Sequence, residues 1–496
     1  MITQRTIQVT REASVLISQL SGVERAIAII KINNINCYRV VKRLSDSSDS
    51  CEGVLSPDLI KEIDGYQPIV DRIVYEATNG SFKGRTWRDL SDFVDDYGSR
   101  FTGTQNLEDA IDHVLLRSRE LGLENVHGDV VPVPKWIRGN ESATMLSPRE
   151  KNLRMLGLGY SIGTPPEGIT AEAIVVESFE ELKRRASEIP GKIVVYNQKF
   201  ISYGKTVEYR SRGAIEAAKV GAVATLIRSI TPFSIYSPHT GMMDYSESVK
   251  KIPAACITVE DAHLLGRLAK RGKKLRISIK MEAHQLASGR SRNLVSEISG
   301  STQPEKVVVV SGHVDSWDVG QGAMDDGGGA FSSWVSVLLL KGLGLQAKRT
   351  IRSIMWTAEE MGIIGANYYI NKYRSQEKNL QMVMESDIGT FLPLGWEATG
   401  SPEVICILRR ITKLLSKMTP LEVKTPHSGP DIENWVNDGV PGASLWNKNE
   451  RYFWFHHSEG DTMDVETPDN LDMATALFAA TSYIIADISL DLPRNT

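Results

Sequence analysis

The chain has 496 residues and a net charge of -4, with 41% apolar and 24% charged residues. This length predicts more than one domain, and the composition is typical of a soluble globular protein. The small net charge and the lack of a Lys/Arg run argue against a nucleic-acid partner. No apolar stretch reaches the roughly 18–20 residues that a membrane span needs, so we expect no membrane span.

Residues 1–55 have weak periodicity and end in the polar run SDSSDS, which predicts a poorly defined N-terminal extension. The first twenty residues have no uninterrupted apolar core and no small-residue cleavage site, unlike a signal peptide, which favours a cytoplasmic protein. Four cysteines in a chain of this length do not suggest a disulfide framework. Asn79 and Asn140 lie in sequons and are candidates for glycosylation if the chain enters the secretory route.

From about residue 56 the chain has a helical pattern. The segment LIKEIDGYQPIVDRIVYEA places apolar residues three and four apart and is broken at Pro68. Amphipathic helices are also expected at Thr86–Tyr97 and Leu107–Leu123. The segment VVPVPKW contains two prolines, which permit an edge strand but not a central one. We expect residues 56–160 to form the N-terminal helical part of a larger domain.

The Gly/Pro-rich segment GLGYSIGTPPEG predicts a boundary, since its glycines match no nucleotide-binding motif. Short strands and helices alternate after it, and Ser178 is in position to cap one of the helices. Residues 161–285 are therefore expected to form an α+β unit that is inserted into the larger domain.

From residue 286 to residue 496 strands alternate with helices of ten or more residues. This alternation predicts an α/β fold with a mostly parallel mixed sheet, flanked by helices on both faces. The expected strands are Lys306–Ser311, Thr350–Thr357, Leu380–Glu385 and Pro441–Trp446. The expected helices are Gly328–Lys341, Gly365–Arg374, Ser401–Lys417 and Thr467–Asp487.

Ligands bind beyond the carboxyl ends of the strands in such a sheet. Histidines and carboxylates follow four of the expected strands: His313, Asp315, Asp325 and Asp326; Glu359 and Glu360; Glu385 and Asp387; His456, His457 and Asp461. Each group alone has an ordinary explanation; Asp326, for example, could cap the next helix. Together they predict a metal centre, with Zn²⁺ preferred over Mn²⁺ or Co²⁺. The surplus of carboxylates suggests two metals with a shared ligand.

The motifs HVDS, AMDDGGGA, WTAEEMG, MESD and FHHSEGDT, in this order, resemble those of the co-catalytic zinc peptidases of family M28. Longer segments, such as SGHVDSWDVGQGAMDDGGGAF and YFWFHHS, are similar to the carboxypeptidase Q (plasma glutamate carboxypeptidase) branch. The resemblance covers residue 56 to the end. It implies the zinc exopeptidase fold, with residues 161–285 as a protease-associated domain and residues 286–496 as the catalytic domain.

The resemblance also implies two Zn²⁺ per chain and a role for each site residue. The implied ligands are His313 and Asp387 for one zinc, Glu360 and His457 for the other, and Asp325 as the bridge. Glu359 matches the general acid/base, and the peptide bond between Asp325 and Asp326 is expected to be cis.

Six further residues are weaker candidates for orienting ligands or contacting substrate: Asp315, Asp326, His427, Asp431, Tyr452 and His456. Asp315 is expected to orient the imidazole of His313. Tyr452 is a candidate donor to the oxyanion, with aromatic packing as the alternative. Pro430 stands where relatives usually have Ser or Thr, and it lacks an N–H donor.

The function implied by the resemblance is that of a dinuclear zinc metallo-exopeptidase that hydrolyses short unblocked peptides, chiefly dipeptides. A zinc-bridging hydroxide would attack the peptide, with Glu359 as general acid/base. A non-catalytic binding protein on this scaffold and a one-zinc glutaminyl cyclase are the alternatives. Relatives of this branch are homodimers and are secreted or lysosomal, so both properties are expected here, with a cytoplasmic location as the alternative.

Overall fold

The structure is a computed structural model, and it describes residues 30–32, 35–37, 51–427 and 429–495. The chain divides into two units, Met1–Gly53 and Val54–Thr496. In the smaller unit, β1 (Ile30–Ile32) and β2 (Ile35–Cys37) pair as an antiparallel two-stranded sheet. The rest of the expected N-terminal extension, residues 1–55, lies largely outside the described residues.

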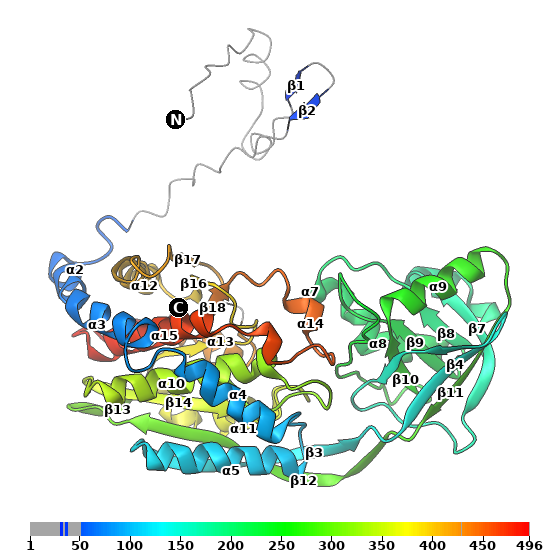
Figure 1. Cartoon of the computed structure of the whole chain (residues 1–496), viewed down its shortest axis with the longest axis horizontal. Helices are drawn as coiled ribbons and strands as arrows, with labels where there is room; N and C mark the ends of the chain where they lie inside the picture. The colour runs from blue at the N-terminus through cyan, green and yellow to red at the C-terminus, as the bar shows by residue number, and fades with distance from the viewer. Residues whose placement is uncertain (1–29, 33–34, 38–50, 428, 496) are drawn as a thin grey trace. The chain divides into compact units, whose positions relative to one another are not determined.

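The larger unit contains an eight-stranded sheet with the order β17-β16-β18-β15-β13-β14-β12-β3 (Figure 1). Its central strands β18, β15, β13 and β14 are parallel, whereas β12 and β3 are antiparallel at one edge. The strands are β3 (Glu124–Ile137), β12 (His284–Ile298), β13 (Gln303–His313), β14 (Arg349–Trp356), β15 (Leu380–Glu385), β16 (Pro393–Thr399), β17 (Glu422–Lys424) and β18 (Gly442–Asn447). The predicted α/β fold with a mixed sheet is confirmed.

Helices cover both faces of this sheet. Val307 and Val309 of β13 pack with Tyr369 and Trp435, while other helices pack on β13 from the opposite face. Its central residues Val307–Val310 are apolar because this part of the strand is buried on both sides. The helices are α10 (Gly328–Gly342), α11 (Ile364–Lys372), α12 (Pro402–Leu414), α13 (Glu433–Asn437), α14 (Tyr452–Phe455) and α15 (Pro468–Asp487).

All strands and helices expected between residues 286 and 496 are present, with ends that differ by a few residues. Ser401 caps α12 through the main-chain N–H of Val404. Strand β16 has no counterpart in the prediction, since Pro393 and Gly395 interrupt its apolar pattern.

In the part of the larger unit that precedes the sheet, the described helices are α2 (Pro57–Asp64), α3 (Gln67–Thr78), α4 (Arg85–Tyr97) and α5 (Gln105–Glu120). The predicted break at Pro68 is confirmed, because this proline lies in the first turn of α3. The predicted edge strand is confirmed as well: β3 contains Pro132 and Pro134 and pairs with β12 alone.

A second eight-stranded sheet, with the order β5-β4-β11-β7-β8-β9-β10-β6, lies between β3 and β12 in the sequence. Because Ile137 of β3 pairs with His284 of β12, the chain leaves and re-enters the first sheet at neighbouring strands. The strands are β4 (Glu141–Ser147), β5 (Lys151–Leu153), β6 (Met155–Gly157), β7 (Ile169–Val176), β8 (Ile193–Tyr196), β9 (Ala224–Arg228), β10 (Ala254–Ile257) and β11 (Leu275–Met281). We call residues Glu141–Met281 the inserted unit.

The inserted unit has the expected α+β composition. Its helices are α6 (Phe179–Arg184), α7 (Tyr203–Thr206), α8 (Glu208–Lys219) and α9 (Val259–Lys270). Ser178 caps α6 through the N–H of Glu181, as predicted. The sheet starts earlier than the boundary expected at residue 161, because β4 pairs antiparallel with β11. The division into domains, and the protease-associated class of this unit, stay predictions.

The cysteines differ in part from the expectation. Cys256 is a free, buried thiol, but Cys51 and Cys406 are disulfide-bonded. Sequence spacing did not predict this, because pairing depends on proximity in the fold.

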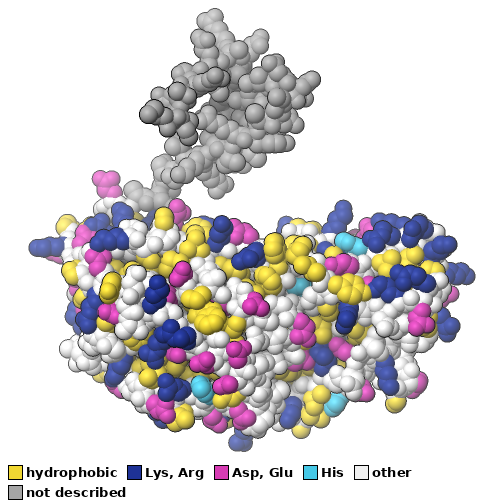
Figure 2. Space-filling model, in the orientation of Figure 1, with side chains coloured by type: hydrophobic (Ala, Val, Ile, Leu, Met, Phe, Trp, Pro, Cys, Tyr) yellow, Lys and Arg dark blue, Asp and Glu magenta, His cyan; other side chains and the backbone are white. Residues whose placement is uncertain are grey.

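None of the described helices is long and apolar enough to cross a bilayer. Figure 2 shows Lys and Arg side chains interspersed with Asp and Glu over the visible face.

Candidate metal centre

The residues predicted at the strand ends converge on one pocket of about 400 Å³. Glu359 and Glu360 follow β14, and Asp387 follows β15. The remaining lining residues include Asp325, Tyr452, His456 and His457. His313 ends β13 and is fully buried behind this wall.

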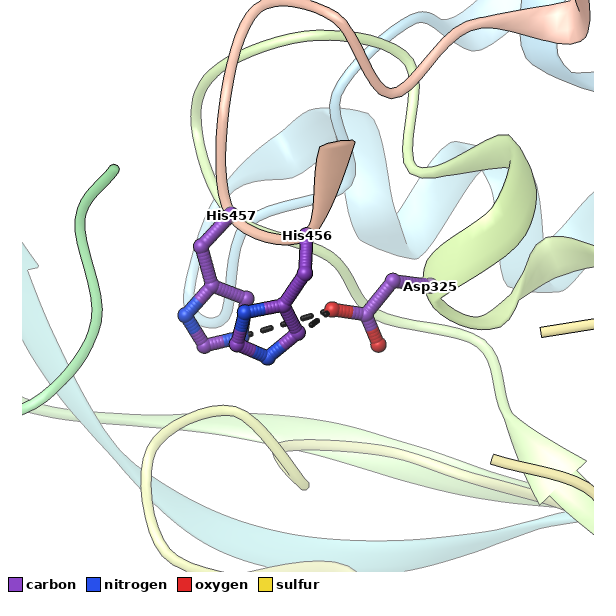
Figure 3. A group of neighbouring side chains, drawn as sticks. All are labelled: Asp325, His456 and His457. Atoms are coloured by element: carbon purple, nitrogen blue, oxygen red, sulfur yellow. Dashed lines mark ion pairs between the residues drawn. The ribbon is translucent and has the colours of Figure 1, made fainter. Parts of the chain in front are cut away.

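Asp325 lies between two groups of side chains. Its Oδ1 is 3.4 Å from His313 Nε2, and its Oδ2 is 3.4 Å from His457 Nε2 and 3.6 Å from His456 Nε2 (Figure 3). His313 Nε2 also lies 3.1 Å from Asp387 Oδ1. The two oxygens of Asp325 therefore face different histidines, which is the arrangement of a bridging ligand.

The second group is completed by Glu360. Its Oε2 lies 2.9 Å from His457 Nε2. Figure 3 shows both imidazoles after α14 directed toward the Asp325 carboxylate. The imidazole of His456 stacks on that of His457, with ring centroids 3.5 Å apart. Glu360 contacts His457 and not His456, so His457 fits a ligand position better.

Two buried carboxylate oxygens of the centre lack a hydrogen-bond partner. Asp325 Oδ2 and Glu360 Oε1 are buried without a hydrogen-bond partner. Burial and neighbouring carboxylates raise the pKa of Glu360 well above its usual range. Buried anionic oxygens without donors call for a cation. Around Asp325, histidine nitrogens and carboxylate oxygens form two groups, and within each group these atoms lie within 4.8 Å of one another. This donor set fits divalent metals.

Both histidines of the proposed ligand set have a fixed ring orientation. His457 Nδ1 lies 3.2 Å from the carbonyl of Thr240, and His313 Nδ1 lies 2.9 Å from the carbonyl of Asp315. An Nδ1–H that donates to a carbonyl leaves Nε2 free to bind a metal. Burial lowers the pKa of His457, which favours the neutral, metal-binding form of its ring.

Asp315 orients His313 through its main chain and not through its carboxylate. Its Oδ1 lies 3.7 Å from His313 Nδ1, which is too long for a hydrogen bond. The carboxylate instead accepts hydrogen bonds from the N–H groups of Glu359 and Glu360 at 3.0 and 3.4 Å. Thr102 Oγ1 donates a third hydrogen bond at 3.0 Å.

Asp326 also has a role different from helix capping. Its Oδ2 accepts a hydrogen bond from the N–H of His313 at 3.0 Å, whereas α10 has no side-chain cap. The peptide bond between Asp325 and Asp326 is cis, as the resemblance implied.

The weaker candidates differ in their distance from the centre. Tyr452 lines the pocket, and its hydroxyl donates to the carbonyl of Asp387 at 3.4 Å. Asp431 is buried, and its N–H donates to Glu385 Oε1 at 3.3 Å. His427 does not line the pocket; its ring contacts Thr399 Oγ1 at 2.9 Å and Glu433 Oε2 at 3.0 Å.

Two residues without an assigned role in the prediction hold the loop that carries Asp325. Asp461 accepts hydrogen bonds from the N–H groups of Met324 and Asp325 at 2.8 and 3.1 Å. Asp461 was predicted among the strand-end residues through the motif FHHSEGDT, but its role in holding this loop was not predicted. Arg100 is fully buried and donates to the carbonyls of Val314 and Gly322, a role without a sequence signal.

The inserted unit also reaches the pocket. Tyr203, Val207, Arg210 and Met242 line it together with the residues of the metal centre. Sequence analysis assigned no site residue to this unit, because the contact depends on the tertiary structure.

Comparisons with known proteins decide the family. Residues 293–482 match the model of peptidase family M28. The chain is 51% identical over 438 residues to carboxypeptidase Q of Homo sapiens and of Xenopus laevis, over 88% of this chain and 93% of each relative. The chain belongs to peptidase family M28. Within M28 it lies in the carboxypeptidase Q branch, and it is an enzyme that hydrolyses peptide bonds.

Solved M28 structures have the same fold. The peptidase M28 precursor from Shewanella amazonensis superimposes with a TM-score of 0.83 at 30% identity, over 88% of this chain and 100% of that one. A zinc aminopeptidase from Bacillus subtilis superimposes with a TM-score of 0.64 over 83% and 98%. At 18% identity, the latter is a likeness in fold alone.

Proposed function

We propose that the chain is a dinuclear zinc exopeptidase that cleaves short unblocked peptides, chiefly dipeptides. The observation that carries the proposal is the position of Asp325, whose two oxygens face two separate groups of histidine and carboxylate ligands. Mixed histidine and carboxylate ligation suits zinc. A structural relative is described as a zinc aminopeptidase, which agrees with this choice of metal.

His313 and Asp387 would hold one zinc, Glu360 and His457 the other, and Asp325 both. When bound, the two ions would polarise the scissile carbonyl and lower the pKa of a water between them. The chain's own residues supply the ligand atoms and hold the imidazoles at Nδ1 by carbonyl groups.

Glu359 is the residue that we assign to proton transfer. It lines the pocket next to the ligand Glu360, and its main chain is fixed by Asp315. Burial and Asp387 raise the pKa of Glu359 well above its usual range. A raised carboxyl pKa suits a group that takes a proton from water and returns it to the leaving amine. Tyr452 also lines the pocket, and we assign its hydroxyl as the donor to the developing oxyanion, in exchange for its hydrogen bond to the carbonyl of Asp387.

We also propose that the enzyme works in a secretory or lysosomal compartment. Disulfide bonds at Cys51 and Cys406 are typical of oxidising compartments. Asn79 and Asn140 are both exposed, as glycosylation requires. Glycan analysis of native protein tests this proposal: unmodified asparagines at both sites would argue against it.

We also propose that the inserted unit belongs to the protease-associated class and that the chain forms a homodimer. Phe233 and Trp454 are exposed, with ring centroids 4.8 Å apart, and Ile235 is 80% exposed. Such apolar side chains favour coverage by a partner. Light scattering on purified protein should give twice the mass of one chain; the mass of a single chain would contradict the dimer.

A digestion of a dipeptide library tests the catalytic proposal. We expect cleavage of free dipeptides, loss of cleavage with a chelator, and recovery when zinc is added. Cleavage that persists after complete removal of metal would contradict it. One zinc per chain without dipeptide cleavage would favour the one-zinc acyl-transfer alternative.

A further inference from the structure

A cluster of basic side chains lies at the end of α9 in the inserted unit. Residues 267–276 read RLAKRGKKLR, with no Asp or Glu among them. All the basic side chains of this segment are exposed: Arg267, Lys270, Arg271, Lys273, Lys274 and Arg276. We call these residues the basic patch. Figure 2 shows Lys and Arg side chains gathered over the inserted unit.

The turn between α9 and β11 brings the members of the basic patch close together. Arg267 and Arg271 are four residues apart at the end of α9, which makes them neighbours on one side of the helix. Leu268 and Leu275 pack into the core of the inserted unit, so the basic side chains around them are left outside. The patch was not predicted from the sequence, because apolar residues and a glycine interrupt the run of charges.

Most of the basic patch has no acidic partner. Lys270 pairs with Glu177 at 2.7 Å, but no other member of the patch forms an ion pair with a residue that the structure describes. Lys273 and Lys274 also line a groove of about 500 Å³. The glutamates that line this groove are already paired: Glu172 with Lys192, Glu177 with Lys270, and Glu181 and Glu188 with Arg185. The positive charge of the patch is therefore in excess.

Stabilisation of the helix accounts for only part of this charge. Cations near the C-terminus of a helix interact favourably with its dipole, which applies to Lys270 in the last turn of α9 and to Arg271 at its C-cap. Lys273, Lys274 and Arg276 lie beyond the helix end, where this effect is small. Because neighbouring like charges repel one another, an external anion would stabilise the patch.

The composition of the segment indicates which kind of polyanion fits. Sites for single-stranded nucleic acid combine basic side chains with aromatic ones that stack on the bases, and residues 267–276 include no aromatic residue. Helices that bind membrane surfaces expose apolar side chains beside the basic ones, whereas Leu268 and Leu275 are buried. A sulfated polysaccharide needs only ionic contacts, and Lys/Arg-rich segments of this length are typical of heparin-binding surfaces.

We propose that the basic patch binds sulfated polysaccharides. This binding is a property beyond peptide hydrolysis, and it rests on the secretory location proposed above, since such polymers occur in the secretory route and at cell surfaces. It does not depend on zinc or on a dipeptide substrate, because no member of the patch lines the pocket of the metal centre.

The test measures binding of the full chain to heparin by calorimetry at about 0.15 M NaCl and at higher salt. Wild type should bind, with a Kd that rises steeply with salt as counterions are released. The triple variant Arg271→Ser/Lys273→Ser/Lys274→Ser should bind about tenfold or more weakly, since it loses three unpaired charges. A folded wild type that does not bind heparin at about 0.15 M NaCl would overturn the proposal.

Lys83→Ser/Arg290→Ser/Lys378→Ser is the matched control. These side chains are exposed, lie outside the inserted unit and form no ion pair with a described residue, so the control has the same net charge as the first triple variant. It should bind heparin within about twofold of wild type. Equal weakening in both variants would show that net charge alone acts, and would overturn the proposal. Dipeptide hydrolysis should be unchanged in both, which separates this test from that of the proposed function.

Two further polyanions test the choice of partner: single-stranded RNA and vesicles that contain phosphatidylserine. Binding to either of them that is tighter than binding to heparin would overturn the assignment to sulfated polysaccharides, as would equal binding of desulfated heparin. Acetylation of wild-type lysines, read by mass spectrometry, needs no substitution. Heparin should protect Lys273 and Lys274 and leave Lys83 reactive; equal labelling of all three with and without heparin would overturn the site.

Discussion

The main-chain N–H of Glu359 donates a hydrogen bond to Asp315 Oδ1 at 3.0 Å. The same carboxylate accepts the N–H of Glu360, while the carbonyl of Asp315 contacts Nδ1 of His313. Asp315 therefore fixes residues from two neighbouring strand ends relative to one another. It connects the proposed proton-transfer residue with a proposed ligand of each metal.

Replacing Asp315 tests this connection. Asparagine has one acceptor oxygen in place of two, so Asp315→Asn leaves one N–H of the Glu359–Glu360 segment opposite an amide donor. We expect zinc affinity or kcat to fall about 10- to 100-fold. Zinc retention against a competing chelator and steady-state kinetics measure the two effects.

Thr102→Val is the control, because it removes only one donor to the same carboxylate. It should lower the free energy of unfolding by about 1 kcal/mol or less. Wild-type zinc affinity and kcat in Asp315→Asn would contradict this role.

Glu466 predicts a pH dependence of stability. It is buried and accepts a hydrogen bond from Thr390 Oγ1 at 2.8 Å, and burial raises the pKa of its carboxyl from 4.5 to about 8. Between these values the folded protein binds more protons than the unfolded chain. This contribution to the free energy of unfolding therefore falls as pH rises, by up to about 1.4 kcal/mol per pH unit.

Glutamine at position 466 cannot lose a proton. Glu466→Gln should therefore reduce the fall in the free energy of unfolding as pH rises. Urea denaturation at several values from pH 5 to pH 8, under identical metal conditions, measures the difference. Glu167→Gln, at an exposed carboxylate, should keep the wild-type slope. An unchanged slope in Glu466→Gln would show that this carboxyl does not take up the proton.

The segment after Glu360 depends on a glycine for close packing. A Cβ at Gly365 would lie 2.1 Å from the carbonyl oxygen of Thr357 and 2.4 Å from Asn293 Oδ1. Gly365→Ala should therefore lower the free energy of unfolding by about 1–3 kcal/mol. Gly204→Ala is the control, because its Cβ would meet nothing within 4 Å and alanine favours the helix there. Equal stability of both variants would contradict the packing argument.

Strand β13 and the residues past the strand ends could be predicted because they obey strong local constraints. A parallel strand covered on both faces must be apolar, as Val307–Val310 are. Ligands bind where such strands end, which is why His313 and the Glu359–Glu360 pair were predicted as site residues.

Other parts of the site depend on contacts that no local pattern records. Arg210 lies in an ordinary amphipathic helix, and only the fold of the inserted unit brings it to the pocket. Asp315 was predicted to orient His313, but it was not predicted that it does so through its carbonyl while its carboxylate contacts Thr102 and the next strand end. The start of the inserted unit at Glu141 likewise follows from pairing between distant strands.

Zinc content and dipeptide hydrolysis of Glu359→Gln, measured on the same sample, test the central claim most directly. A dinuclear zinc peptidase with Glu359 as acid/base predicts two zinc ions per chain, as in wild type, and a kcat lowered about 10²- to 10⁴-fold. The paired variant Glu360→Gln should instead lose zinc. A Glu359→Gln enzyme with full activity, or folded wild-type protein that binds no zinc, would contradict the account.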